Sequence, residues 1–295
     1  MKSTAFKQMV LEHLSTYKNE VLGISNNGMW KNNRFQYSHI LPENLKELNF
    51  LPMTSPIEAV HTAPNISFHS GAHHLNSSQI MCINFFAPLL RDAEGLSILK
   101  EIIKKETLIK FTDEATIVKA CFEYEPDEKE GTNFDFYMEL STGERILFEI
   151  KYTESGFGSI HKDKNNPNKY DDKWEKHYDQ QTNKSLYLKG ISKEDFYKNY
   201  QIWRNVSYIV NDSDYVVFLF SYLNNSHVQE IQKTVGFSKK QKYANVSSLC
   251  WYSFIRTALA LTKDSKYYFH FHLFKEKYLK FTISVDEMTN LEKLY

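Results

Sequence analysis

The chain has 295 residues, of which 42% are hydrophobic and 15% aromatic, so it can bury the core of one large domain. Lys and Arg together number 36, as do Asp and Glu, and the formal net charge is therefore zero. This balance argues against a protein that coats nucleic acid through its overall charge, although it allows a local basic cleft. No apolar run reaches the roughly 18 residues that would indicate a membrane span.

Cysteine usage indicates the redox environment. Cys82, Cys121 and Cys250 lie far apart, and their spacing matches no metal-binding template. We therefore expect buried thiols and a reducing, cytoplasmic location. The N-terminus agrees with this expectation, because it leads into an amphipathic segment and not into a signal peptide.

The first predicted elements are helices. Residues 4–20 repeat apolar side chains at helical spacing, which predicts an amphipathic helix. The irregular residues 21–75 are expected to pack on the core as an arm. Two serines then offer N-cap side chains for a helix over 79–87, and a second helix is predicted over 93–105.

Strands dominate the middle of the chain. Three are predicted over 116–125, 133–140 and 145–152, where apolar and polar side chains alternate as in a meander. A helix over 194–210 and a buried strand over 214–222 follow. The order helix, three strands, helix, strand indicates an α/β fold with a mixed central sheet flanked by helices.

The remaining segments complete the predicted organisation. The polar loop 154–172 is interpreted either as a solvated loop or as a mobile lid whose lysines contact phosphates. A helix is predicted over 251–261 and a strand over 266–274, a region that could extend the sheet or mediate dimerisation. We expect three parts in one domain: an N-terminal extension (1–75), a core (76–225) and a C-terminal extension (226–295).

The strand pair around Asp135 and Glu149 is the most informative feature of the chain. Side chains alternate along both strands, so each strand has one core face. The expected core face consists of Phe134, Phe136, Met138, Leu140, Ile146, Phe148 and Ile150. The turn between the strands is expected to set Leu140 opposite Ile146 and Asp135 opposite Lys151. Glu149 then lies diagonally across from Asp135, on the same polar face.

This polar face carries residue types that suit phosphodiester chemistry. Two carboxylates bind a hard cation such as Mg²⁺, which prefers oxygen ligands and keeps several waters. A lysine beside them can hold a phosphate oxygen or the attacking water. The alternative interpretation is a surface hairpin with a structural Glu149–Lys151 pair. Because the carboxylates lie on strands rich in apolar residues, the pattern favours the catalytic interpretation.

These residues and the order of elements resemble the PD-(D/E)XK nuclease superfamily, whose restriction-endonuclease-like core is αβββαβ. The resemblance covers roughly residues 70–222 and is sharpest over 148–158. It extends to residues 200–205 and to the segment 76–79 with the helix that follows. The family resembled is a bacterial one within this superfamily. The resemblance implies the αβββαβ core, with N- and C-terminal extensions added to it.

The resemblance also implies roles for particular residues. Asp135 and Glu149 would be metal ligands for Mg²⁺ or Mn²⁺, with the carbonyl oxygen of Ile150 as a third ligand. Lys151 would position the water and stabilise the transition state. Gln201 lies on the helix after the motif, where related nucleases place a supporting glutamine or tyrosine; its alternative role is that of a helix-surface amide.

One departure from the superfamily pattern leaves an alternative open. The Pro-Asp pair of the superfamily name occurs here as Pro126-Asp127, in a charged segment that is expected to be a turn. Asp127 is therefore an alternative first metal ligand, although the strand pattern favours Asp135. Glu123 and Glu125 could help to bind a second metal or serve as edge charges.

The sequence thus predicts a metal-dependent nuclease that hydrolyses phosphodiester bonds of nucleic acid. DNA is the expected substrate, with RNA, strandedness and sequence specificity left open, as is a homodimer. A role in restriction or defence rests on the resemblance alone. The alternative is a catalytically inactive nucleic-acid-binding or protein-interaction module on the same fold.

Overall fold

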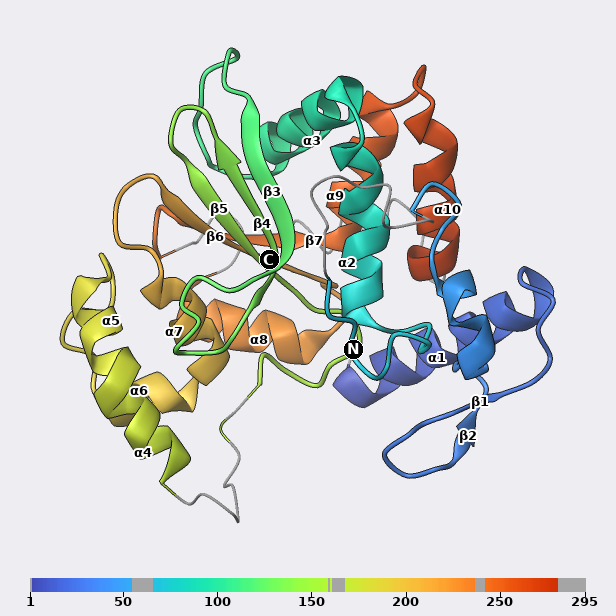
Figure 1. Cartoon of the computed structure of the whole chain (residues 1–295), viewed down its shortest axis with the longest axis horizontal. Helices are drawn as coiled ribbons and strands as arrows, with labels where there is room; N and C mark the ends of the chain where they lie inside the picture. Colours follow the sequence, from blue (N-terminus) through green and yellow to red (C-terminus); the bar gives the residue numbers. More distant parts are fainter. Residues whose placement is uncertain (1, 55–65, 159, 161–167, 237–241, 281–295) are drawn as a thin grey trace.

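A five-stranded mixed sheet forms the centre of the computed structural model, which describes residues 2–54, 66–158, 160, 168–236 and 242–280 (Figure 1). The strand order is β3-β4-β5-β6-β7. Three antiparallel strands come first: β3 (Ile117–Tyr124), β4 (Phe134–Leu140) and β5 (Arg145–Ile150). Two strands then continue the sheet in parallel pairing: β6 (Asp214–Phe220) and β7 (Val246–Cys250).

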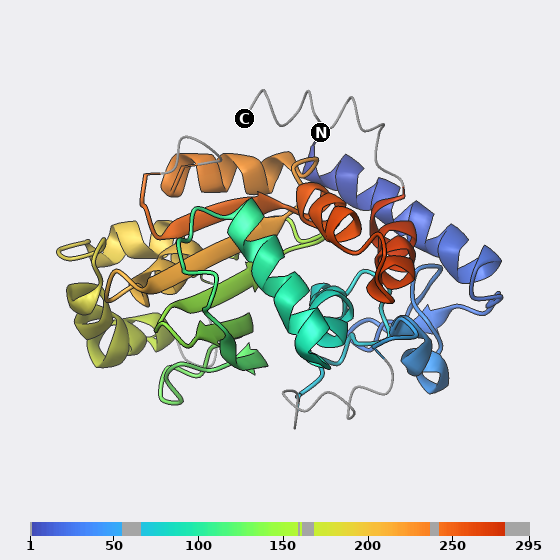
Figure 2. The same cartoon turned by 90° about the horizontal axis from the view of Figure 1, so that it is seen from above.

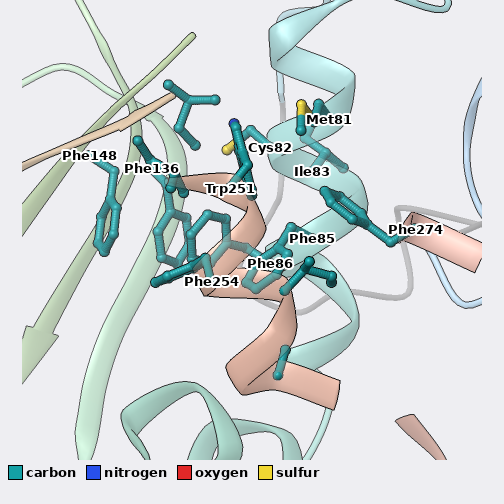
Figure 3. Close-up of a cluster of buried hydrophobic side chains, with 14 of the residues drawn as sticks. Met81, Cys82, Ile83, Phe85, Phe86, Phe136, Phe148, Trp251, Phe254 and Phe274 are labelled. Atoms are coloured by element: carbon teal, nitrogen blue, oxygen red, sulfur yellow. The ribbon is translucent and has the colours of Figure 1, made fainter. Parts of the chain in front are cut away.

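Helices cover one face of the sheet, and several of them carry buried aromatic residues. They are α2 (Ser78–Phe86), the short 3-10 helix η3 (Ala87–Leu90), α3 (Ala93–Glu106), α9 (Trp251–Leu261) and α10 (Tyr267–Leu279), with α1 (Ser3–Glu20) packed on α10. The ring of Phe86 on α2 stacks on Phe136 of β4 at 4.1 Å, and Phe85 lies 5.5 Å from Trp251 and 5.4 Å from Phe274 (Figure 3). Such buried ring pairs dominate core energetics, so this face fixes how the helices dock on the sheet.

Two helices cover the opposite face. α7 (Tyr200–Ser207) and α8 (Asn225–Thr234) pack apolar side chains against β5, β6 and β7. Ile202 and Val206 of α7 belong to the same buried cluster as Leu147 and Val216 of the sheet. Since β5 and β6 contribute alternate residues to the two clusters, they are buried on both faces, as parallel strands usually are.

Two smaller units lie at opposite ends of the longest axis in both views (Figures 1 and 2). One contains α4 (Lys169–Lys173), the π-helical turn η4 (Trp174–Tyr178), α5 (Asp179–Lys184) and α6 (Lys193–Lys198), around buried Tyr178, Phe196 and Tyr197. The other contains the two-stranded hairpin β1 (Gly28–Met29) and β2 (Gln36–Tyr37) with the 3-10 helix η1 (Glu43–Asn49).

The predicted αβββαβ order is confirmed as α3-β3-β4-β5-α7-β6. The Ser77 side chain accepts a hydrogen bond from the Ile80 amide at 3.3 Å and so caps α2 as the serine pattern predicted. The bounds of α9 are those expected from the sequence. None of the helices in the described part of the chain is long and apolar enough to cross a bilayer.

Two predicted elements were wrong, and others were missed. The single helix predicted over 194–210 is broken at Asn199, whose φ of −132° and ψ of 51° are not helical. The strand predicted over 266–274 is helix α10, because Phe271, Phe274 and Tyr278 recur on one buried face. Helix α8 and strand β7 were not predicted.

The β4–β5 register also differs from the prediction. Met138, not Leu140, pairs with Ile146, because the Leu140 amide donates to the Glu144 carbonyl across a three-residue turn at 2.9 Å. The shift is two residues, so the same side chains share a face as predicted. The expectation of one core face per strand was wrong, because Tyr137 and Leu147 are buried under α7 and α8 on the face expected to be polar. Phe134 does not share the face of Phe136; it packs in the cluster of α7 and α8.

Two expectations stay predictions. The division at residues 75 and 225 is not decided by the fold, and neither is the cytoplasmic location. Part of the expected lid, with His161, Lys162 and Lys164, lies outside the described residues, while α4 occupies its end from Lys169.

Candidate active site

The three expected site residues lie together where β5 ends. Glu149 is the penultimate residue of β5, and Lys151 follows the strand directly. Phe136 pairs with Phe148, and one further step of this register places Asp135 opposite Glu149. Asp135 thus lies closer to Glu149 than the predicted diagonal position.

Hydrogen bonds connect the three side chains to the strand end. The Lys151 Nζ donates to Oε1 of Glu149 at 2.8 Å. The Ile150 amide donates to Oδ2 of Asp135 at 2.6 Å. One carboxylate is therefore bound to the lysine and the other to the backbone between Glu149 and Lys151.

Helix α7 supplies the other partners of Glu149. Gln201 donates through Nε2 to Oε1 at 2.6 Å, and Asn205 donates through Nδ2 to Oε2 at 2.8 Å. Nη2 of Arg204 lies 3.4 Å from Oε2. Positions three and four residues apart share one helix face, which explains why these side chains reach the same carboxylate. Glu149 is only 3% exposed, and its carboxylate has four cationic or amide partners: Lys151, Gln201, Arg204 and Asn205.

The pKa values of the two carboxylates are shifted in opposite directions. Burial would raise the pKa of Glu149, but the charges of Lys151 and Arg204 and the hydrogen bonds from Lys151 and Asn205 lower it overall. Burial and the neighbouring charge of Glu149 raise the pKa of Asp135 well above its usual range. Two acids with pKa values displaced in opposite directions are typical of functional sites.

The lysine is held in its charged form. Burial would lower the pKa of Lys151, but the charges of Glu149, Glu154 and Asp135 raise it above the ordinary lysine value. Lys151 can therefore supply a positive charge to an anion, and it is not suited to be a proton acceptor at neutral pH.

The donor set suits a small hard cation. Two carboxylates and the Ile150 carbonyl are oxygen ligands of the kind that Mg²⁺ prefers, and a nearby cation would reverse the unfavourable ionisation of Asp135. Both oxygens of Glu149 already accept hydrogen bonds, so one donor would have to move. Within the described ranges, no group of three or more His, Cys, Asp or Glu side chains is arranged to hold a metal.

A cavity of about 490 Å³ opens beside Lys151. Its wall includes Gln201, Lys198 and the loop that leaves β5. Glu230 of α8 holds this loop, because its Oε2 accepts the Phe157 amide at 2.8 Å. A substrate phosphate that entered the cavity would meet Lys151 and Lys198, and also the acidic residues Glu154 and Glu230.

The alternative acids lie outside the Glu149–Lys151 pair. Asp127 is in the turn after β3; its Oδ1 accepts the Lys129 amide at 2.9 Å. Glu123 lies nearer, and its charge contributes to the raised pKa of Asp135. Its two oxygens accept hydrogen bonds from Gln79 and Asn133 at 2.9 and 3.3 Å. The structure therefore brings Asp135, and not Asp127, to the strand end.

Two site residues were missed in the sequence. Asn205 follows Gln201 at helical spacing, and this i to i+4 pattern could have indicated a shared partner. Glu230 gave no signal, because the helix that carries it was not predicted.

Comparison with known proteins identifies the family. A family model described as "Restriction Endonuclease associating with ARP" matches residues 11–279. The chain belongs to this family. The match spans the sheet, both helical layers and the strand end with its acids, and it confirms the restriction-endonuclease-like relationship. No curated protein and no solved structure matches significantly.

Proposed function

We propose that this protein is a metal-dependent nuclease that uses Asp135, Glu149 and Lys151 to hydrolyse a phosphodiester bond. One observation carries the proposal. Two acids with oppositely displaced pKa values, Glu149 buried and Asp135 partly buried, lie at the end of β5 beside Lys151, which lines a cavity, in a member of a restriction-endonuclease-like family. The family supports nuclease activity in general, and the residues provide the particular chemistry.

Each residue has a separate task in this proposal. The 2.8 Å hydrogen bond to Glu149 orients Lys151, whose ammonium donates to a phosphate oxygen or to the attacking water. Gln201 and Asn205 hold the two oxygens of Glu149 so that the carboxylate keeps one orientation. The Ile150 amide fixes Asp135 in the same way.

Magnesium or manganese is the proposed cofactor. Asp135, Glu149 and the Ile150 carbonyl would hold the ion, which when bound polarises the phosphate and acidifies a water. The proposed substrate is DNA, and the family description adds association with ARP as a property of the family. We propose the same association for this chain.

A cleavage assay tests the proposal. Plasmid, single-stranded DNA and RNA are incubated with wild type, Lys151→Ala and Asp135→Asn, with Mg²⁺, Mn²⁺ or EDTA. Cutting that needs the metal and is lost in both variants supports the nuclease and its site together. Cutting that survives both substitutions assigns the activity to other residues or to a contaminant.

A non-cleaving nucleic-acid-binding or protein-interaction module is the second candidate. The saturation of Glu149 by Lys151, Gln201, Arg204 and Asn205 favours it, because this carboxylate is neutralised without a metal. Calorimetric titration with Mg²⁺ separates the candidates. Absence of binding by wild type, together with absence of cutting, would support the module.

A further inference from the structure

The β1–β2 hairpin carries exposed aromatic side chains that the proposed catalytic machinery does not use. Phe35 is 67% exposed, Met29 48% and Trp30 41%. The Trp30 amide donates to the Phe35 carbonyl at 2.9 Å, so the two residues are cross-strand neighbours. Directly opposed residues of a ribbon point to the same face, so Trp30 and Phe35 lie on one face of the hairpin, where the Tyr37 ring also lies 5.9 Å from that of Trp30.

Charge at the hairpin is one-sided. The sequence from Gly28 to Tyr37 contains Lys31 and Arg34 and no acidic residue. Lys31 is paired with Glu43 at 3.1 Å, whereas Arg34 lies exposed at the end of the turn. A positive tip with exposed rings suits a polyanion that also has flat apolar groups.

The backbone at the tip is strained at the arginine. Arg34 has a φ of +60°, a region that glycine or asparagine occupies with less strain. Its amide is fixed by the Trp30 carbonyl at 2.8 Å, which closes the turn. An arginine at such a position suggests that its side chain has a use beyond the turn itself.

The base of the hairpin is firmly anchored. The Gly28 amide donates to the Ile40 carbonyl at 2.8 Å, and a ring nitrogen of His73 bonds the Met29 carbonyl at 3.0 Å. A Cβ at Gly28 would lie 2.0 Å from the Leu41 carbonyl oxygen, so the backbones are in close contact. The rings are thus presented on a rigid support, which lowers the entropy cost of binding.

A short path of contacts joins the hairpin to the candidate site. The Trp30 and His74 rings lie 6.3 Å apart, edge to face. Two residues beyond His74, the Asn76 side chain donates to Oγ1 of Thr153 at 2.8 Å. Thr153 is two residues after Lys151. These contacts connect the hairpin, through His74 and Asn76, to the segment that follows Lys151.

We propose that this hairpin binds an unpaired stretch of the nucleic-acid strand that continues from the scissile phosphate. Bases stack on Trp30 and Phe35, and Arg34 contacts a backbone phosphate. The proposal rests on the proposed nuclease function for the direction of the strand. Aromatic stacking with a cationic neighbour binds unpaired bases with little sequence preference.

Binding without cleavage tests the proposal. Wild-type full-length protein is titrated in EDTA with a fluorescein-labelled single strand and with the same sequence as a duplex, and anisotropy is recorded. Trp30→Leu combined with Phe35→Leu should weaken single-strand binding by about fivefold or more. The matched control is Phe269→Leu, which removes a 70% exposed ring on α10 and should leave binding unchanged.

A second variant avoids any loss of folding. Arg34→Gly suits the positive φ, so the hairpin keeps its shape while one charge is removed. We expect weaker binding and a log–log salt slope reduced by about 0.7. Equal binding by wild type, the double variant and Arg34→Gly would overturn the proposal and leave the hairpin for a protein contact.

The outcomes separate this proposal from the nuclease itself. If cutting depends on the metal but single-strand binding is unchanged in the hairpin variants, only the proposed role of the hairpin is refuted. Binding that depends on the hairpin, without cutting at any metal concentration, refutes the nuclease and the path from a scissile phosphate, and keeps the hairpin as a single-strand binding site. Absence of both binding and cutting refutes the two together.

Discussion

The two ends of the β5–β6 pair each bury a carboxylate, and the charge of that carboxylate is compensated differently at the two ends. At one end Asp214, which is fully buried, pairs across the register with Arg145. The Arg145 Nε donates to Oδ1 at 2.6 Å, and the Val210 and Asn211 amides donate to Oδ2 at 3.0 Å. One acid meets one cation and two backbone amides, as expected of a structural ion pair.

At the other end two acids share one strand end. Glu149 has two cations and two side-chain amides around it, while the Asp135 carboxylate accepts, among the residues that the structure describes, a single hydrogen bond, from the Ile150 amide. Like charges side by side raise the cost of ionising one of them. The comparison teaches that a site is marked by a carboxylate whose ionisation is opposed by burial and also by a neighbouring acid, and not by burial alone.

Removing the cation at each end should have the largest effect, and a different one at each end. Lys151→Met is expected to lower kcat by about 10²–10³, because a positioned charge at the developing anion is lost. Arg145→Met removes the equivalent partner of Asp214 and should lower stability while kcat changes little. Single-turnover cleavage and urea unfolding of both variants check this. Equal losses of kcat would mean that Lys151 acts only through folding.

Removing the structural acid should have the next largest effect. Asp214→Ala leaves two backbone amides and a cation without their partner, which is expected to cost about 3 kcal/mol of unfolding free energy. The control is Asp212→Ala, an exposed residue in the same turn, which should change stability by less than about 0.5 kcal/mol. The urea midpoints of the two variants, compared at constant m-value, measure the difference in unfolding free energy.

The helix donors to Glu149 should matter less than Lys151. Asn205→Ala removes a fully buried donor to Oε2 and should reduce cleavage about tenfold, equivalent to one hydrogen bond to a charged group. Gln201→Ala removes the donor to Oε1 at a partly exposed position, where water can replace it, and should have a smaller effect. Steady-state kinetics on both variants measure the difference, and a larger loss for Gln201→Ala would contradict the assigned order.

Much of the fold could be predicted because its signals are local. Periodicity in α1, capping at Ser77 and alternation in β4 depend on near neighbours in the sequence, and each gave the right element. The strand predicted at α10 failed for the opposite reason. The aromatic side chains near residue 270 fit both the two-residue repeat of a strand and the 3.6-residue repeat of a helix. Only packing against α2 and α9 selects the helix.

The site was predictable in its face but not in its contacts. Alternation placed Asp135 and Glu149 together whichever even register was chosen, so an error of two residues did no harm. The Asn205 donor depends on how α7 crosses β5, which follows from the break at Asn199 and from distant packing. Phe134 does not lie on the expected face of β4. On the face where it does lie, the Arg204 guanidinium is 5.9 Å from the centroid of its ring.

The smallest predicted effect concerns Asp135, whose negative charge has fewer favourable partners than that of Glu149. Because burial and Glu149 raise the folded-state pKa of Asp135, its protonated form is favoured by folding. The stability it contributes is present below the ordinary carboxyl pKa and is lost as the pH rises through the raised value. Asp135→Asn keeps an oxygen for the Ile150 amide but carries no charge.

In EDTA, we therefore expect Asp135→Asn to be more stable than wild type at pH 8 by about 1 kcal/mol, and the gain to shrink toward pH 5. Urea unfolding at both pH values measures it, with Asp212→Asn as the exposed control. A variant that loses cleavage while gaining stability would show that the fold tolerates Asp135 at a cost, as expected of a residue kept for chemistry. A variant destabilised equally at both pH values would instead assign Asp135 to the structure, like Asp214 at the opposite end.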